Sequence, residues 1–171
     1  MERPQPGDYA EYYQQYIERV PDGPIIEILE QVHRETQEFI QGIDEEKSEY
    51  RYAEGKWSIK EVLIHVIDTE RIMGYRALTF ARGDKTELPG FDQDIYGFNS
   101  GAKDRTIKDI AQEMGIVRNA SISLFKNFSD EMMAMDGIGN NNKVTVNSVA
   151  YLLVGHELHH MNVIREKYLA S

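Results

Sequence analysis

The spacing of apolar residues constrains this chain most, because it is helical over four long segments. The first runs from residue 25 to 43 and has apolar residues at intervals of three and four, namely Ile25, Ile28, Leu29, Val32, Phe39, Ile40 and Ile43. This is the pattern of a helix with one buried face. The second begins after Ser58, a predicted N-cap with Glu61 three residues later, and stops at Gly83.

The same pattern recurs over residues 107–128 and 146–169. No strand-like alternation stands out, so the four segments predict an all-α four-helix bundle. A long crossover loop, residues 83–105, is expected between the second and third helices, because it is rich in Gly, Pro and Asp and has no sustained period. A short extra N-terminal helix over residues 9–20 is expected to pack outside the bundle, with its tyrosines as cover.

Composition limits the domain number and the partners. The 171 residues are 41% hydrophobic, which suits a single domain over residues 1–171 with one sizeable core. The formal net charge of −10, without a basic cluster, argues against nucleic acid and anionic membranes as partners. The N-terminal residues lack an apolar signal core and no apolar run has membrane-spanning length, so a cytoplasmic location is expected.

The last helical segment contains His156-Glu157-Leu158-His159-His160. This matches the H-E-x-x-H string of zinc metalloproteases, in which two histidines one turn apart hold the metal and the glutamate activates water. Such proteases take a third ligand downstream, but here only Glu166 follows, on the opposite side of the same helix. The protease reading is therefore disfavoured.

The faces of the helices separate the histidines. His156 and His160 fall within the apolar stripe of Val149, Leu153, Val163 and Ile164, so both imidazoles are expected to point into the bundle. A buried imidazole needs a partner, which is either a metal ion or hydrogen bonds to tyrosine or backbone. Both readings stay open for this pair.

A third ligand is expected from upstream. His65 lies at the edge of the buried face of the second helix, whereas His33 and His159 lie off their stripes. A set of His65, His156 and His160 leaves one coordination position open, as in catalytic metal sites.

Carboxylates next to the predicted ligands suggest supporting roles. Asp68 and Glu157 are candidates to orient the imidazoles, and Glu157 is also a candidate general base, although both can equally be solvated charges. In the crossover loop, substrate contacts are predicted for Asp92, Gln93, Asp94 and Tyr96. The alternative reading of that loop is a turn capped by Asp.

Three stretches carry a family resemblance: KWSIKEVLIHVIDTER, LPGFDQDIYG and VAYLLVGHELHHMNVIREKYL. Over residues 25–169 the chain resembles the DinB superfamily, specifically its DinB-like and YfiT-like metal-binding members. The resemblance implies a four-helix bundle with one divalent metal, zinc or nickel. It also implies ligation by one histidine of the second helix and two of the last, here His65, His156 and His160.

The resemblance implies chemistry and partners as well. Characterised relatives are S-transferases that use bacillithiol, mycothiol or a similar small thiol, and others are assigned as metal-dependent hydrolases. The chain has no cysteine, so a thiol has to come from a co-substrate. A thiol-dependent transferase acting on a small electrophile is therefore predicted. The first alternative is a metal-dependent hydrolase, and the second alternative is a non-catalytic, stress-related metal-binding protein. The resemblance is also compatible with a homodimer.

Overall fold

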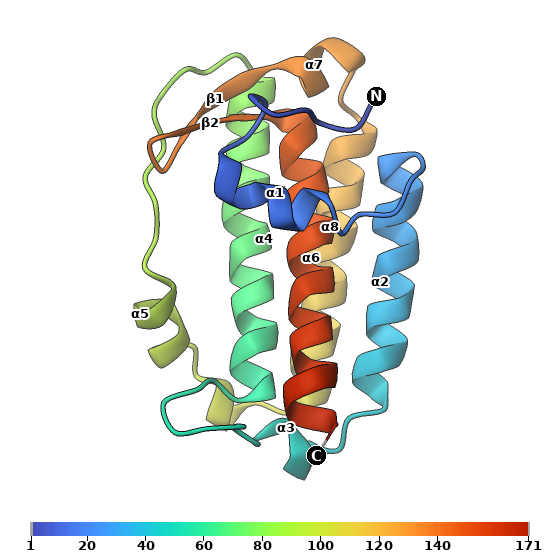
Figure 1. The fold of residues 1–171 in the computed structure, drawn as a ribbon, viewed down its shortest axis with the longest axis vertical. Coiled ribbons are helices and arrows are strands. Elements are labelled where there is room, and N and C mark those ends of the chain that lie inside the picture. The colour runs from blue at the N-terminus through green and yellow to red at the C-terminus, as the bar shows by residue number, and fades with distance from the viewer. Residues whose placement is uncertain (1, 171) are drawn as a thin grey trace.

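The computed structural model describes residues 2–170 and consists mainly of four long helices (Figure 1). These are α2 (Ile25–Gln41), α4 (Ile59–Ala81), α6 (Ile107–Lys126) and α8 (Val146–Val163). Helices α2 and α4 each pack against α6 and α8, so they lie diagonally across the bundle although they are neighbours in the sequence. The predicted four-helix bundle is confirmed. Within the described part of the chain, no helix has both the length and the apolar character needed to cross a membrane.

Local sequence signals set the ends of α4 as predicted. The Ser58 hydroxyl accepts a hydrogen bond from the Glu61 backbone N–H, and the Glu61 carboxylate accepts one from the Ser58 N–H. This reciprocal capping box satisfies N–H groups that have no partner inside the helix. Gly83 follows the helix with φ of +76°, a conformation in which glycine has no Cβ penalty. Helix α8 continues into a π-helical turn, η3 (Ile164–Leu169).

The segment between α4 and α6 is a long crossover, as expected, but it contains regular structure. A short helix α5 (Gln93–Phe98) and a 3₁₀ turn η2 (Ala102–Asp104) lie within it. The Asp92 carboxylate caps α5 by accepting hydrogen bonds from the N–H groups of Asp94 and Ile95. Another one-turn helix, α3 (Glu45–Ser48), joins α2 to α4. Helices this short cannot show a helical repeat in the sequence.

Between α6 and α8 the chain forms a helical turn α7 (Asp130–Ala134) and a short β-hairpin, which no alternation in the sequence had indicated. Strands β1 (Asp136–Gly139) and β2 (Asn142–Thr145) pair antiparallel. Their connection is Asn140–Asn141, with φ of 52° and 60°. Two left-handed residues are what a tight hairpin turn requires, and asparagine tolerates them well. Leu88 of the crossover pairs with this hairpin through a bridge to Gly139.

The N-terminal segment lies across the outside of the bundle, over α4 and α8 (Figure 1). It forms η1 (Glu11–Tyr13) and α1 (Gln14–Ile17). Its contact with α8 is close, because a Cβ atom placed on Gly155 would lie only 2.0 Å from the Tyr16 carbonyl oxygen. Gly155 therefore permits α1 to approach α8 next to His156.

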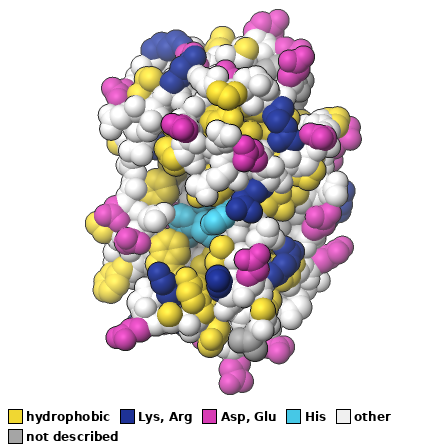
Figure 2. All heavy atoms as spheres, viewed as in Figure 1, with side chains coloured by type: hydrophobic (Ala, Val, Ile, Leu, Met, Phe, Trp, Pro, Cys, Tyr) yellow, Lys and Arg dark blue, Asp and Glu magenta, His cyan; other side chains and the backbone are white. Residues whose placement is uncertain are grey.

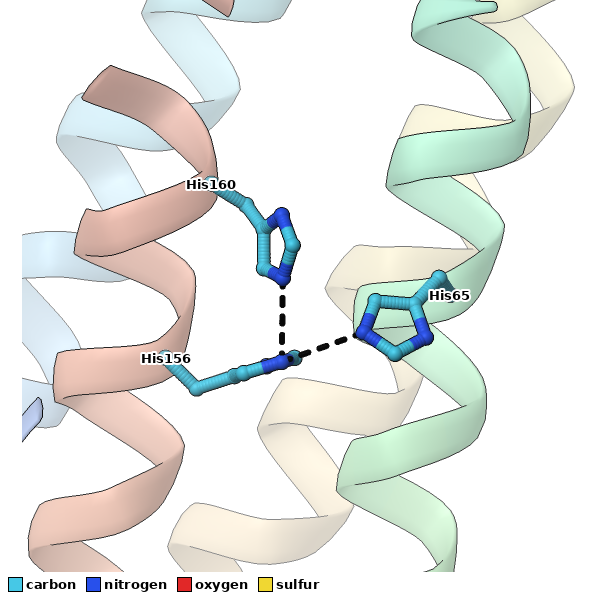
Figure 3. Close-up of side chains that lie close together, drawn as sticks. All are labelled: His65, His156 and His160. Carbon is cyan, nitrogen blue, oxygen red and sulfur yellow. Dashed lines mark hydrogen bonds between the residues drawn. The ribbon is translucent and has the colours of Figure 1, made fainter. Parts of the chain in front are cut away.

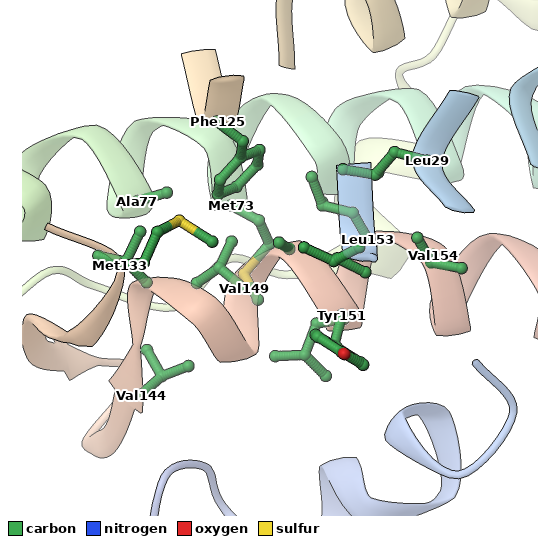
Figure 4. Close-up of a cluster of buried hydrophobic side chains, with 14 of the residues drawn as sticks. Leu29, Met73, Ala77, Phe125, Met133, Val144, Val149, Tyr151, Leu153 and Val154 are labelled. Carbon is green, nitrogen blue, oxygen red and sulfur yellow. The ribbon is translucent and has the colours of Figure 1, made fainter. Parts of the chain in front are cut away.

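The interior contains two apolar clusters with a polar layer between them. The first, shown in Figure 4, includes Leu29, Met73, Phe125 and Val149. The second includes Ile40, Leu63, Ile110 and Ile164. On α4, α6 and α8 the residues between the clusters include buried charged side chains, namely Glu70, Arg118 and Glu157. The predicted histidines His65, His156 and His160 lie at the edge of this polar layer.

Candidate metal centre

Three imidazoles from two helices converge on one point (Figure 3). The His156 Nε2 atom lies 3.2 Å from His65 Nε2 and 3.1 Å from His160 Nε2. One ligand nitrogen from each of the three residues lies within 4.8 Å of the others. The structure thus brings together the three histidines predicted from the sequence.

Helix geometry explains the convergence. His156 and His160 are four residues apart on α8, so their side chains lie one above the other on the same face. Helix α4 packs against that face and contributes His65. Nitrogen ligands at 2.0–2.1 Å from a tetrahedral ion are separated by about 3.3 Å. The two close nitrogen separations are near this value, so the donor set fits a divalent transition metal.

The surroundings keep the imidazoles neutral. Burial lowers the pKa of His65 to about 4, opposed by the nearby Asp94 charge. Burial and the neighbouring His65 and His159 lower the pKa of His160 to about 3. Burial, together with His160 and the other two histidines, holds the pKa of His156 well below its ordinary value. Only a neutral imidazole has a lone pair for a metal, so all three are available as ligands at pH 7.

A cavity of about 220 Å³ opens beside His65 and His156. Figure 2 shows histidine side chains at a hollow in the surface, flanked by hydrophobic side chains. Most of the wall is apolar or aromatic, and Met73, Leu152 and Leu153 belong to it. Such a lining suits a small organic molecule, with a few polar groups to fix its orientation.

The N-terminal tyrosines have a larger role than the predicted one of cover. The helix does lie outside the bundle, but Tyr12, Tyr13 and Tyr16 all line the cavity. The Tyr16 ring packs edge-on against His156, with ring centres 5.5 Å apart, and against His159 at 5.4 Å. The first helix of the chain therefore forms part of the wall next to the histidines.

The four loop residues predicted to contact substrate have different positions. Gln93 lines the cavity, and the charge of Asp94 is close enough to act on His65. Asp92 caps α5, which agrees with the alternative reading of a turn capped by Asp. Tyr96 lies outside this cavity and packs on Phe91 with ring centres 5.2 Å apart. Phe91 is the loop aromatic that reaches the cavity.

The suggested supporting carboxylates do not contact the imidazoles. Glu157 is almost fully buried and pairs with Arg118, so its position does not support the predicted role of general base. The Asp68 carboxylate forms an ion pair with Arg71, with the Oδ1 and Nη1 atoms 3.8 Å apart, and within residues 2–170 it makes no hydrogen bond to a histidine. The glutamate of the H-E-x-x-H string therefore forms a buried ion pair and does not face the histidine cluster.

Arg118 connects three helices through buried ion pairs. Its Nε and Nη2 atoms each donate to the Glu70 carboxylate at 2.8 Å, and Nη2 also pairs with Glu157. All three side chains are at most 2% exposed. Although burial would lower the pKa of Arg118, the two carboxylates raise it, so the guanidinium stays charged. No periodic pattern in the sequence indicates this triad.

The two remaining histidines lie outside the cluster, as predicted. His33 is partly buried on α2 and its ring edge approaches Gly115 of α6. His159 stacks edge-on against Tyr16 and contributes no atom to the converging set.

Sequence reasoning missed several cavity residues, above all Arg76, Phe91 and Asn140. Arg76 follows His65, Thr69 and Met73 along one face of α4, a spacing that could have indicated it. Phe91 and Asn140 come from the crossover and the hairpin turn, and their positions depend on contacts between distant segments.

Comparison with known proteins gives consistent results. Residues 28–164 match the DinB superfamily. A protein of Oceanobacillus iheyensis named as a candidate metal-dependent hydrolase is 26% identical over 156 residues, covering 88% of this chain and 89% of the relative. YfiT from Bacillus subtilis, described as a probable metal-dependent hydrolase with an unusual four-helix bundle topology, superposes with a TM-score of 0.75. That alignment has 16% identity and covers 99% of this chain and 93% of YfiT.

Proposed function

The chain belongs to the DinB superfamily, and from this membership and its three converging imidazoles we propose that it is a metal-dependent enzyme that transfers a small-molecule thiol to an electrophilic substrate. The observation that carries the proposal is the cluster of three neutral nitrogen donors at the edge of a cavity. Three protein ligands leave a coordination position open, which is the arrangement of catalytic metal sites.

His65, His156 and His160 would hold the metal. When bound, zinc or nickel supplies a Lewis acid that lowers the pKa of a coordinated thiol or water. Around it, Tyr16 and Leu153 provide an apolar wall that excludes water and orients an organic substrate. Next to such a wall the nucleophile is poorly hydrated, and the attraction between charges is stronger than in water.

Among the described residues, the cavity wall provides neither a thiol nor a carboxylate as a nucleophile. The chain contains no cysteine. Glu157, the nearest carboxylate in sequence, is engaged with Arg118. A thiol from outside therefore supplies the nucleophile in the proposed reaction.

Hydrolysis is the second candidate, and the names of the two relatives favour it. It would use the same three histidines and the same cavity, with water in place of the thiol. The two reactions differ in the reactant that is consumed, so one set of assays distinguishes them.

The test uses the full chain purified without a histidine tag and loaded with zinc or nickel. We expect one metal ion per chain, measured by elemental analysis. With bacillithiol, glutathione or cysteine and a chloronitrobenzene or bimane electrophile, we expect conjugation above the uncatalysed rate. His65→Ala, His156→Ala and His160→Ala should lose both metal and conjugation, because two imidazoles from one chain rarely hold such an ion alone.

His159→Ala is the matched control, since His159 neighbours the ligands without joining them, and it should retain metal and activity. Stoichiometric metal in a His156→Ala, His160→Ala double variant would contradict the ligand assignment. Turnover of esters or amides with the same metal and histidine dependence, without thiol consumption, would replace the transferase proposal with the hydrolase one.

A further inference from the structure

Arg76 is a buried cation on the wall of the cavity. Its side chain is 4% exposed, and it projects from α4 on the face that also carries His65, Thr69 and Met73. No carboxylate among residues 2–170 forms an ion pair with it, in contrast to Arg118, the other buried arginine, which has two. Burial of a charge without a counter-ion costs several kcal/mol unless another group compensates.

The hydrogen bonds of Arg76 leave donors free. Its Nη2 atom donates to the Pro89 carbonyl at 2.7 Å, and Nη1 contacts only the Met73 sulfur, a weak acceptor, at 3.3 Å. Nε has no acceptor within the described chain. The Arg76 side chain packs closely against β1, because a Cβ atom on Gly139 would lie only 3.1 Å from its Nε and Cδ atoms.

Charge around the cavity favours an anion here. The protein has a formal net charge of −10, yet Arg76 is the one Lys, Arg, Asp or Glu side chain among the described residues of this wall. The hydroxyl oxygen of Thr69, on the same wall, also lacks a described hydrogen-bond partner. A positively charged guanidinium with free N–H groups is suited to a carboxylate, to which it can donate charge-assisted hydrogen bonds.

The two ends of the cavity are well separated. His65 and Arg76 are eleven residues apart on one helix, which places their Cα atoms about 16 Å apart along its axis. Met73 and Leu153 lie on the wall between these ends. A molecule that reaches both ends has to be elongated and apolar in the middle.

We propose that Arg76 binds a carboxylate of the substrate, so that the cavity takes an organic acid whose carboxylate is separated from its reacting end by an apolar segment. The placement of the reacting end at the histidines rests on the function proposed above. The carboxylate contact does not, because it involves neither the metal nor turnover.

The test compares two probes of the same shape, 4-phenylbutyrate and its neutral amide, by calorimetric or NMR titration of the full chain. Titrations are done first with chelator and then with zinc, since a carboxylate could also reach the metal. We expect the carboxylate to bind at least about tenfold more tightly than the amide in both conditions, as a charge-assisted hydrogen bond allows. This preference should vanish in Arg76→Met and survive in part in Arg76→Lys.

Arg82→Met is the matched control, because Arg82 lies just after the end of α4, six residues beyond Arg76, where it is exposed and does not line the cavity. It should keep the full preference. The melting temperature distinguishes a ligand-binding arginine from a purely structural one, because loss of a structural arginine would lower it. Arg76→Met should melt at the same temperature as the parent or higher, because the substitution removes a buried charge.

Equal binding of acid and amide to the parent chain, or no binding of either, would overturn the proposal. A carboxylate preference that persists in Arg76→Met would also overturn the proposal. If the melting temperature of this variant falls at the same time, the role of Arg76 is structural, namely to hold the loop at Pro89 in position. A carboxylate preference that depends on Arg76 with chelator present, but no metal-dependent reaction, would retain this inference and reject the proposed function.

Discussion

The three clustered imidazoles of His65, His156 and His160 are costly to protonate, and this links the site to the stability of the chain. In the unfolded chain a histidine takes up its proton near pH 6.5. In the folded chain the pKa of His65 is about 4 and that of His160 about 3, because burial opposes the charge. As the pH falls below 6.5, the unfolded state binds more protons than the folded one, so folding becomes less favourable.

We therefore predict that the metal-free chain loses stability between pH 7.5 and 5. The stability is fully present above about pH 6.5 and is lost as the pH falls toward the lowered pKa values. His65 alone accounts for a loss of about 2 kcal/mol in the free energy of unfolding between pH 7.5 and pH 5. Urea unfolding with chelator at the two pH values measures the loss.

His65→Leu is the comparison variant, and its stability should depend less on pH over the same range. A parent chain equally stable at pH 7.5 and 5 would show that these histidines are not held neutral. For the metal-bound chain the same low pKa values predict that metal is retained well below pH 6.5, because protons compete weakly for the folded site.

At the scale of elements, the contact between α1 and α8 depends on the absence of one side chain. A Cβ atom on Gly155 would overlap the Tyr16 carbonyl, which is backbone and cannot rotate away. We predict that Gly155→Ala displaces α1, weakens the packing of Tyr16 on His156 and destabilises the chain by about 1–3 kcal/mol. Chemical denaturation measures the free energy, and tyrosine fluorescence reports the displaced helix.

Gly74→Ala is the matched control within another helix. A Cβ atom there meets no other atom within 4 Å, so α4 should gain the usual advantage of alanine over glycine, about 0.5–1 kcal/mol. If both substitutions stabilise the chain equally, α1 does not rest on Gly155.

The elements also show what could be read from the sequence. Helices α2, α4, α6 and α8 are long enough to repeat an apolar face several times, and the imidazoles of α8 were placed by that same repeat. The six residues of α5 and the four-residue strands are shorter than the patterns that reveal them. Even so, the run of asparagines at 140–142 is a turn signal that could have indicated a hairpin.

Contacts between distant segments could not be predicted in this way. Glu157 follows a histidine in a catalytic-looking string, yet its carboxylate belongs to Arg118, 39 positions earlier in the sequence. The role of Tyr16 depends on how α1 crosses α8, and that of Arg76 on the loop carbonyl of Pro89. Nothing in the local spacing of these residues fixes such partners.

Across the whole molecule, the buried triad ties α4, α6 and α8 together at mid-height. Arg118 separates the carboxylates of Glu70 and Glu157, which would otherwise face each other without a cation. We predict that Arg118→Met destabilises the chain by about 3–5 kcal/mol, since removal of one partner leaves uncompensated buried charge. Urea unfolding at pH 7.5 measures the effect.

Arg71→Met provides the surface control. Arg71 is half exposed and pairs with Glu113 and Asp68, so its loss should cost no more than about 1 kcal/mol. A loss of comparable size for both variants would mean that the triad contributes little beyond an ordinary surface pair.

The polar layer also has a consequence for how substitutions combine. It separates the apolar cluster that contains Leu29 from the one that contains Leu63, and the two clusters have no described residue in common. Residues without common neighbours have small coupling energies, so the costs of Leu29→Ala and Leu63→Ala should sum within about 0.5 kcal/mol in the double variant. For protein engineering, each half of the bundle is then a separate module that can be repacked while the other half, and the histidines between them, keep their geometry.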